Sequence, residues 1–192
     1  MIVGNVLIKN ITNHKIINSA IRTINDNLDK PLIHRLFYCL QNIDIKHYDI
    51  KDIAELDKKF SECDAIVFDR DIYVNINVIN KMNSKNVAKL LIHELFHIVR
   101  NYTNKNVKVW CCDTKFYNKN MIYREELIAH TIESICFRQI IYISESEWIK
   151  IKYRVLASYN NYENLQEITD DSIEVPNSRA NILKTIKEAL FY

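Results

Sequence analysis

The chain has 192 residues, of which 48% are hydrophobic and 26% are charged, and its formal net charge is +2 at pH 7. This length and composition are typical of a globular protein that buries a full hydrophobic core, so we expect one domain over residues 1–192. The small net charge, without a block of like charges, excludes the basic surface of a nucleic-acid-binding protein.

The sequence contains neither a signal segment nor an apolar run long enough for a membrane span. Its five cysteines are an odd number without a C-x-x-C pair, which favours free thiols in a reducing compartment. We therefore expect a cytoplasmic protein with no membrane contact, while leaderless secretion or a leader already removed stays open as the alternative.

Amphipathic patterns predict three helices in the N-terminal third, from about Lys15 to Leu28, from Pro31 to Leu40 and from Asp52 to Glu62. Pro31 suits the first turn of a helix. The chain has a single glycine, so we expect asparagine to serve in turns and caps, because it tolerates left-handed backbone conformations.

Two apolar segments then predict a β-hairpin. Residues 64–69 are an apolar run bounded by acids, and Asp71 to Val78 alternate apolar and polar side chains. An exposed edge of the second strand could bind an extended peptide through main-chain hydrogen bonds, whereas an ordinary sheet strand is the alternative.

An apolar helical pattern follows, with the capping-type Ser84 at its start. Within it stands His93-Glu94-Leu95-Phe96-His97, an H-E-x-x-H motif. Residues four apart lie on one face of a helix, so His93 and His97 can direct two imidazoles at one zinc ion. The alternative is a pair of histidines that are merely packed or solvated on an amphipathic helix.

The chemistry of zinc hydrolases explains each position of the motif. A catalytic zinc takes three protein ligands and keeps a fourth position for water, whose pKa it lowers from about 15.7 toward 7. Glu94 is then placed to accept the proton of that water as general base and to pass it to the leaving amine.

A second helical pattern beginning near Arg124 offers the third ligand. Glu126 and His130 are four residues apart and share a helix face, so both can approach a metal. Glu125 and Glu133 are weaker rivals, and a solvated acidic pair in the first turn of the helix is the alternative for Glu125 and Glu126.

The C-terminal part predicts further helices. One runs from Ser146 to about Ser158 and is broken by the asparagine-rich segment 160–164, and another runs from Arg179 to Leu190. We expect the aromatic end of the chain, residues 191–192, to dock on the body of the protein.

The H-E-x-x-H motif with Glu126 to His130, an E-x-x-A-x pattern, resembles the gluzincin metallopeptidases over roughly residues 66–140. Similar patterns occur in the catalytic domain of anthrax lethal factor, the minigluzincins and the ImmA/IrrE-type peptidases. The resemblance implies zinc bound by His93, His97 and Glu126, with Glu94 as general base and His130 in a supporting position. It also implies an α+β, zincin-like fold, in which a small mixed sheet packs beside the H-E-x-x-H helix and a ligand-bearing helix and further C-terminal helices follow.

By the same resemblance, a tyrosine near Glu126 would stabilise the oxyanion, and Tyr123 or Tyr117 could serve. The substrate would be a protein or peptide bound extended along the strand near Tyr73–Val78. The function expected is therefore that of a zinc-dependent endopeptidase. A metal-bound or inactive binding and regulatory module with the zincin fold is the alternative, although such a module needs no general base.

Overall fold

The computed structural model describes residues 2–3, 6–27, 47–55, 63–68, 71–103, 119–138, 142–160 and 178–191. The chain divides into two compact units, Met1–Cys112 and Asp113–Tyr192. The expectation of one domain over residues 1–192 stays a prediction, since two compact units can belong to one domain.

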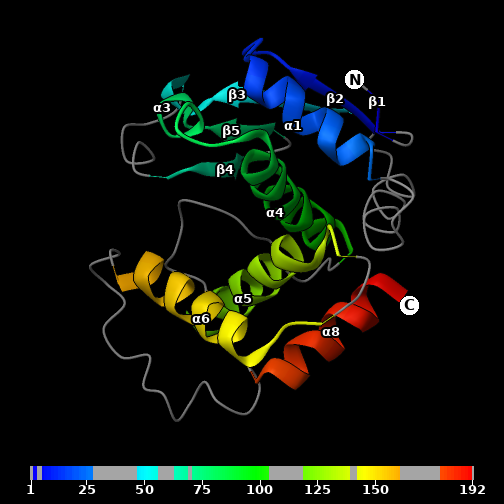
Figure 1. The fold of residues 1–192 in the computed structure, drawn as a ribbon, viewed down its shortest axis with the longest axis vertical. Helices are drawn as coiled ribbons and strands as arrows, with labels where there is room; N and C mark the ends of the chain where they lie inside the picture. Colours follow the sequence, from blue (N-terminus) through cyan, green and yellow to red (C-terminus); the bar gives the residue numbers. More distant parts are fainter. Residues whose placement is uncertain are drawn as a thin grey trace. The chain divides into compact units, whose positions relative to one another are not determined.

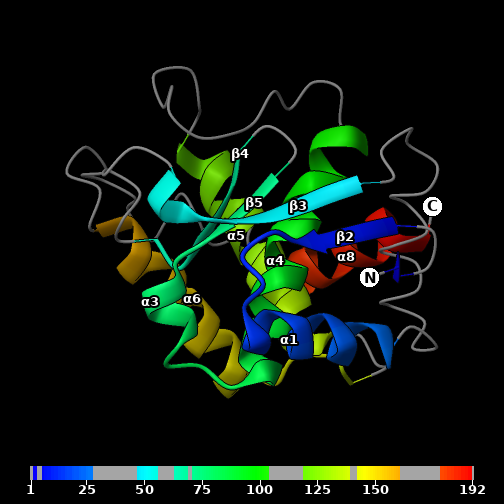
Figure 2. The same ribbon diagram turned by 90° about the horizontal axis from the view of Figure 1, so that it is seen from above.

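The first unit contains a five-stranded mixed sheet in the order β1-β2-β3-β5-β4 (Figures 1 and 2). The strands β2, β3 and β5 are parallel to one another, and the outer strands β1 and β4 are antiparallel to their neighbours. The strands are β1 (Ile2–Val3), β2 (Val6–Asn10), β3 (His47–Asp52), β4 (Ala65–Phe68) and β5 (Asp71–Val74).

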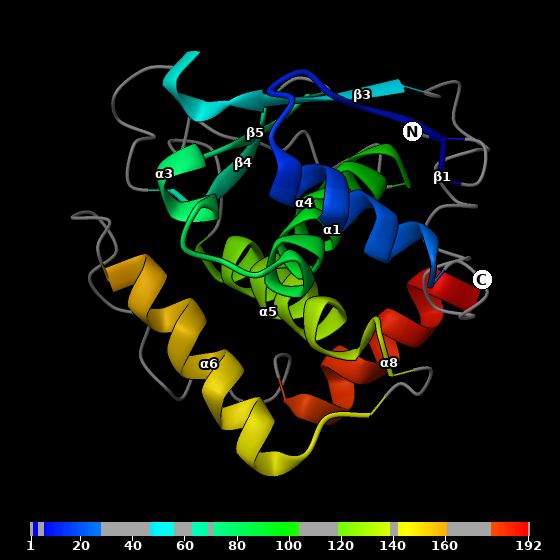
Figure 3. The same ribbon diagram turned by 45° about the horizontal axis from the view of Figure 1, so that its top comes forward.

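Two helices of the first unit pack against each other and against this sheet. Helix α1 (Lys15–Asn25) contacts β1 and β2, and helix α4 (Ser84–Thr103) contacts β4 and β5 (Figure 3). The apolar face of α1 is fully buried, at Ile17, Ala20, Ile21 and Ile24. The two helices and the sheet thus share one hydrophobic core, which fixes α4 beside the β4 edge of the sheet.

An asparagine lies shortly before the first residue of each of these two helices. Asn13 takes a left-handed conformation, with φ of 56°, in the turn from β2 to α1, as expected for a chain with one glycine. Asn83 caps α4, because its side-chain oxygen accepts a hydrogen bond from the Asn86 N–H at 2.9 Å. The capping serine predicted at Ser84 is therefore wrong by one residue, and Ser84 is the first residue of the helix.

The predicted hairpin is confirmed as the antiparallel pair β4 and β5. Its second strand is shorter than predicted, because β5 ends at Val74 and residues 76–79 form the short helix α3 (Ile76–Ile79). Asn75 causes this change, since its side chain accepts a hydrogen bond from the Asn77 N–H at 3.1 Å and caps α3.

The predicted helix from Asp52 to Glu62 is wrong where the structure describes it. Residues 47–52 form β3, and Ile53–Glu55 form a single 3-10 turn, η1. Strand β3 pairs with both β2 and β5, so tertiary pairing decides its conformation over local preference. The predicted helix from Pro31 to Leu40 lies outside the described residues.

Strand β5 lies inside the sheet and has no open edge for a substrate. Its residues pair with β3 on one side and with β4 on the other. The predicted binding of an extended peptide along Tyr73–Val78 is therefore corrected: Tyr73 and Val74 are already paired, and positions 76–78 are helical. Within the described part of the chain, β4 is the strand at this end of the sheet.

The second unit consists, in its described residues, of three helices. They are α5 (Lys119–Ile135), α6 (Glu145–Asn160) and α8 (Arg179–Phe191). Helix α5 packs against both others and lies between them (Figures 1 and 3). The predicted C-terminal helices are confirmed to within one residue at their starts, while α5 begins five residues before Arg124. The side chains at residues 191–192 are outside the described set.

A capping box starts α6. The Ser144 hydroxyl accepts a hydrogen bond from the Glu147 N–H at 3.4 Å, and the Glu147 carboxylate accepts one from the Ser144 N–H at 3.2 Å. Arg138, just after α5, pairs with the same carboxylate. Glu147 thus links Arg138, at the end of α5, to Ser144, at the start of α6.

The protein is therefore a mixed α/β structure with a small mixed sheet, as the sequence predicts. Among the helices described, none combines the length and the apolar character that crossing a membrane requires.

Candidate metal site

The H-E-x-x-H motif lies in the middle of α4, and its two histidines and its glutamate are all buried. His93, Glu94 and His97 expose 6%, 5% and 4% of their surface. The two imidazoles converge, with their Nε2 atoms 3.0 Å apart and their rings nearly perpendicular at 81°. One helix face therefore brings two ring nitrogens to a single point, as the four-residue spacing predicts.

The surroundings of the pair are apolar. The neighbouring residues of α4 are almost completely buried, namely Leu91, Ile92, Leu95, Phe96 and Ile98. The helix packs on α1, β4 and β5, so these side chains form part of the core of the first unit. Polar groups in such a position are costly to bury unless they are compensated, and the Nε2 contact between the two rings supplies part of that compensation.

The geometry of the two histidines fits a zinc-type ion. Two nitrogens bound tetrahedrally to one zinc at about 2.0–2.1 Å lie about 3.3–3.4 Å apart, close to the observed separation of Nε2 atoms. Neutral imidazole is also a preferred ligand of zinc. Glu94 follows His93 directly in α4 and is buried as both histidines are.

The remaining predicted site residues belong to α5 in the second unit. Glu126 and His130 are both partly exposed and lie one turn apart on that helix. Tyr123 is completely buried, and since α5 begins at Lys119 it lies one turn before Glu126, as its proposed role requires. Tyr117 lies outside the described residues.

Within the second unit, His130 contacts Glu133, which in turn contacts Arg154. Its Nδ1 lies 2.9 Å from one carboxylate oxygen of Glu133, and the other oxygen accepts a hydrogen bond from Arg154 of α6 at 3.2 Å. The side chains of His130 and Glu133 are only 16% and 13% exposed, whereas that of Arg154 is 62% exposed.

Sequence reasoning considers Glu133 only as a weak rival metal ligand and overlooks its pairing with His130. The spacing of three residues on a helix is a signal for such a pair. The contribution of Arg154 has no local signal, because it depends on how α6 packs against α5.

No family model, curated protein or solved structure matches this chain.

Proposed function

We propose that the chain is a zinc-dependent endopeptidase with a zincin-like fold. The observation that carries this proposal is the convergence of the His93 and His97 Nε2 atoms on a helix that also buries Glu94. The mixed sheet packed beside α4 supports the fold assignment, since this is the arrangement that the gluzincin resemblance implies.

His93 and His97 supply two ligands, and we assign the third to Glu126 of the second unit. In many catalytic zinc sites, the protein ligands are two neutral imidazoles and one carboxylate. Glu126 is also partly exposed, as a ligand must be to reach an ion outside its own helix bundle. His130 remains the rival for this position, and a comparison of Glu126→Ala with His130→Ala decides between them by which variant loses zinc.

Glu94 acts as the general base in this proposal. The bound metal supplies Lewis-acid chemistry, by lowering the pKa of water and polarising the scissile carbonyl. Glu94 accepts the proton of the attacking water and delivers it to the nitrogen of the leaving amine as the C–N bond breaks. Its burial among apolar residues of α4 removes competing water from the carboxylate.

We place the substrate at β4 instead of β5. Strand β4 ends the order of the described sheet, and a strand at such an edge can bind an extended peptide through its N–H and C=O groups. Because α4 contacts β4 within the same unit, a peptide bound there would run beside the helix that carries Glu94. This arrangement favours a protein or peptide substrate over a small molecule.

Tyr123 is the proposed hydrogen-bond donor to the oxyanion. Its complete burial equally suits a core side chain, so the proposal needs a variant that removes the hydroxyl alone. Tyr123→Phe should lower kcat by about 100-fold or more if the hydroxyl stabilises the transition state. An unchanged kcat would assign Tyr123 to the core of the second unit.

The cytoplasm is the compartment that we propose for this activity. The two cysteines in the described residues, Cys63 and Cys136, are both free thiols, which suits a reducing compartment.

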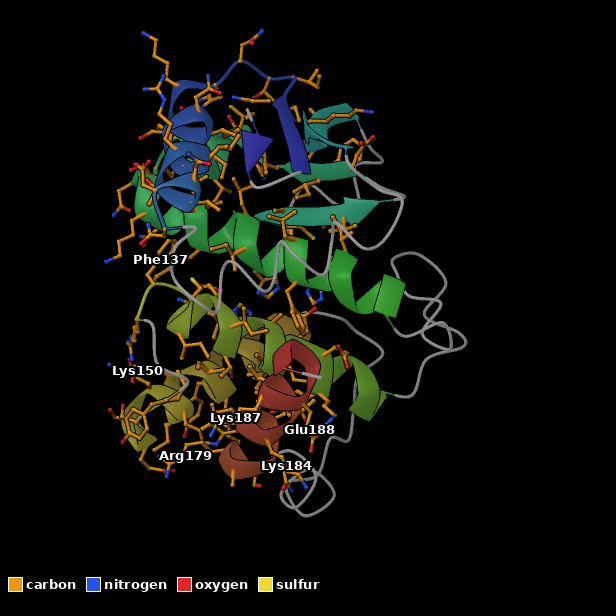
Figure 4. All side chains as sticks on the ribbon, turned by 90° about the vertical axis from the view of Figure 1, so that its right-hand side faces the viewer. Phe137, Lys150, Arg179, Lys184, Lys187 and Glu188 are labelled. Carbon is orange, nitrogen blue, oxygen red and sulfur yellow. The ribbon has the colours of Figure 1, made fainter. Side chains whose placement is uncertain are left out.

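The proposal is tested by zinc analysis and peptide hydrolysis on the full chain. We expect one zinc per chain after gentle purification, and cleavage within a diverse library of unstructured peptides. Glu94→Gln should keep the zinc and lower the rate by about 100- to 10,000-fold, since only proton transfer is removed. Glu188→Gln, on exposed α8, makes the same charge change and should keep full activity (Figure 4).

Absence of zinc in the wild type would contradict the metal site itself. Stoichiometric zinc without cleavage of any peptide would contradict the enzyme and favour the binding module. Cleavage that survives Glu94→Gln would contradict the assigned base.

A further inference from the structure

Two lysines precede the histidine pair along α4 at the same spacing of four residues. Lys85, Lys89, His93 and His97 therefore follow one side of the helix, with a rise of about 6 Å from each to the next. In the first half of α4 this side faces outward, because Lys85 and Asn86 are exposed and Lys89 is partly exposed. The two lysines thus form a cationic row that leads to the proposed metal ligands.

The elements around this row carry little negative charge. Residues 72–93 contain three lysines and neither aspartate nor glutamate. Helix α1, which packs against α4, contains Lys15 and Arg22 and no acid. Strands β4 and β5, which also contact α4, contribute one acid, and that residue, Asp71, pairs with Lys51 of β3 at 2.6 Å. The cationic row therefore stands out on this side of the first unit.

The two lysines are available for an external carboxylate. Within the part of the chain that the structure describes, neither Lys85 nor Lys89 forms an ion pair or a side-chain hydrogen bond. The single acid of α4, Glu94, is rotated by about 100° around the helix from His93.

We infer that Lys85 and Lys89 bind acidic side chains of the peptide substrate on one side of the bond that is cleaved. This inference rests on the proposed endopeptidase and names its class of substrate. In an extended peptide, alternate side chains point to the same side and lie about 6.6 Å apart, close to the rise between the two lysines. Two acidic residues separated by one residue therefore fit the row, with carboxylates opposite ammonium groups.

Binding is tested apart from cleavage, with the full-length Glu94→Gln chain. Fluorescence anisotropy compares three labelled, unstructured peptides of equal length that contain two glutamates separated by one residue, two adjacent glutamates, or two glutamines. The separated glutamates should bind about 2- to 30-fold more tightly than the glutamines, the range expected for two exposed ion pairs. Adjacent glutamates should bind with intermediate affinity, because they point to opposite sides. The preference should disappear at about 1 M salt, where the screening length is about 3 Å.

The two lysines are tested by reversing their charge. Lys85→Glu combined with Lys89→Glu should reverse the preference, so that a peptide with lysines in place of the separated glutamates binds more tightly than the original. Zinc content and circular dichroism show whether this variant keeps its fold. Lys184→Glu combined with Lys187→Glu makes the same charge change on exposed α8 and should keep the wild-type preference (Figure 4).

The outcomes separate the inference from the proposed function. Equal binding of the glutamate and glutamine peptides would overturn the inference, and so would a glutamate preference that persists in the folded Lys85→Glu, Lys89→Glu variant. A wild type that cleaves peptides without regard to acidic residues would retain the proposed function and overturn only the inference. Binding of separated glutamates through Lys85 and Lys89, without cleavage of any peptide by the wild type, would contradict the proposed function and retain the acidic-peptide site.

Discussion

Helices α4 and α5 carry their polar groups in two different environments. On α4, two imidazole nitrogens face each other 3.0 Å apart inside an apolar core. On α5, His130 meets a carboxylate, and an arginine from α6 meets the same carboxylate. The α5 group contains a carboxylate paired with an arginine, while the α4 group brings together two atoms of a kind that can bind a metal. A cation should therefore matter more to the α4 histidine pair than to the α5 group around His130.

The largest effect should come from removing an α4 imidazole. We expect His97→Ala to weaken zinc binding by more than the factor of about 100 that bounds the loss of a supporting residue, because a direct ligand is lost. Zinc content after dialysis and the dissociation constant from chelator competition measure this.

His14→Ala is the matched control within the first unit. His14 contacts Asn80 at 2.9 Å and has no part in the α4 cluster, so its variant should bind zinc as the wild type does. Equal zinc affinity in His97→Ala and His14→Ala would show that the α4 imidazole does not bind the zinc, and would contradict the contrast between α4 and α5.

Added zinc should stabilise the helices that carry its proposed ligands, α4 with His93 and His97 and α5 with Glu126. A ligand that binds only the folded state adds about 2.7 kcal/mol to the free energy of unfolding at 100 times its dissociation constant. Hydrogen exchange should show this protection at α4 and the neighbouring sheet, and a smaller change at α6 and α8. Uniform protection would mean that the two units unfold together.

Core substitutions sharpen the same comparison. Ile24 of α1 and Ile186 of α8 are both completely buried, one in each unit. Each change to alanine should cost about 2–5 kcal/mol of stability, since it removes packed methyl groups and leaves a cavity.

Denaturant unfolding, followed by a spectroscopic probe in each unit, measures the stability of these two variants. If the units unfold separately, each variant should lower only its own transition. A single shared transition that both variants shift equally would show that the units are one cooperative structure.

Helix caps should give effects of about 1 kcal/mol. Asn83→Ala removes the acceptor for the Asn86 N–H and should destabilise the start of α4 by that amount, as measured by the free energy of unfolding. Ser84→Ala is the control, because Ser84 lies inside the helix. A larger loss in Ser84→Ala would restore serine as the cap.

Sequence patterns predict helices better than strands in this chain. Helices α1, α6 and α8 have amphipathic patterns that require only their own residues, and their starts match the prediction. Strand β3 contains the alternation of a strand in residues 47–52, but its conformation depends on pairing with β2 and β5. The pairing of Asp52 with Val74 extends this strand one residue into the predicted helix, and the local sequence does not indicate that pairing.

In the candidate site, too, local contacts are predictable from the sequence, whereas contacts that depend on helix packing are not. The convergence of His93 and His97 follows from helix geometry alone, so their spacing predicts it fully. The bridge from His130 through Glu133 to Arg154 requires the packing of α6 on α5, and the sequence predicts only its first, local contact. The role of Glu126 as a ligand stays a prediction from chemistry and spacing.

The smallest effect that we predict depends on pH and concerns Glu147. Its carboxylate accepts hydrogen bonds from Arg138 and from the hydroxyl and N–H of Ser144, which lower its pKa from 4.5 to about 2. Since the folded pKa is below the unfolded one, the contribution to stability is complete above pH 4.5 and disappears as the pH falls to about 2. Because the side chain is 28% exposed, solvent screening limits this contribution to about 1 kcal/mol or less.

The variant Glu147→Gln should therefore be less stable than wild type at pH 7 by up to about 1 kcal/mol, and equally stable near pH 2. Urea unfolding of the second unit at both pH values measures the difference. Glu188→Gln, whose partner Lys184 is 3.8 Å away on an exposed helix face, should show no difference at either pH. At pH 2 the protonated carboxyl of Glu147 and the amide of Gln make similar neutral contacts. If the difference in the free energy of unfolding between Glu147→Gln and wild type were unchanged at pH 2, the effect would come from the shape of the capping box and not from the charge of Glu147.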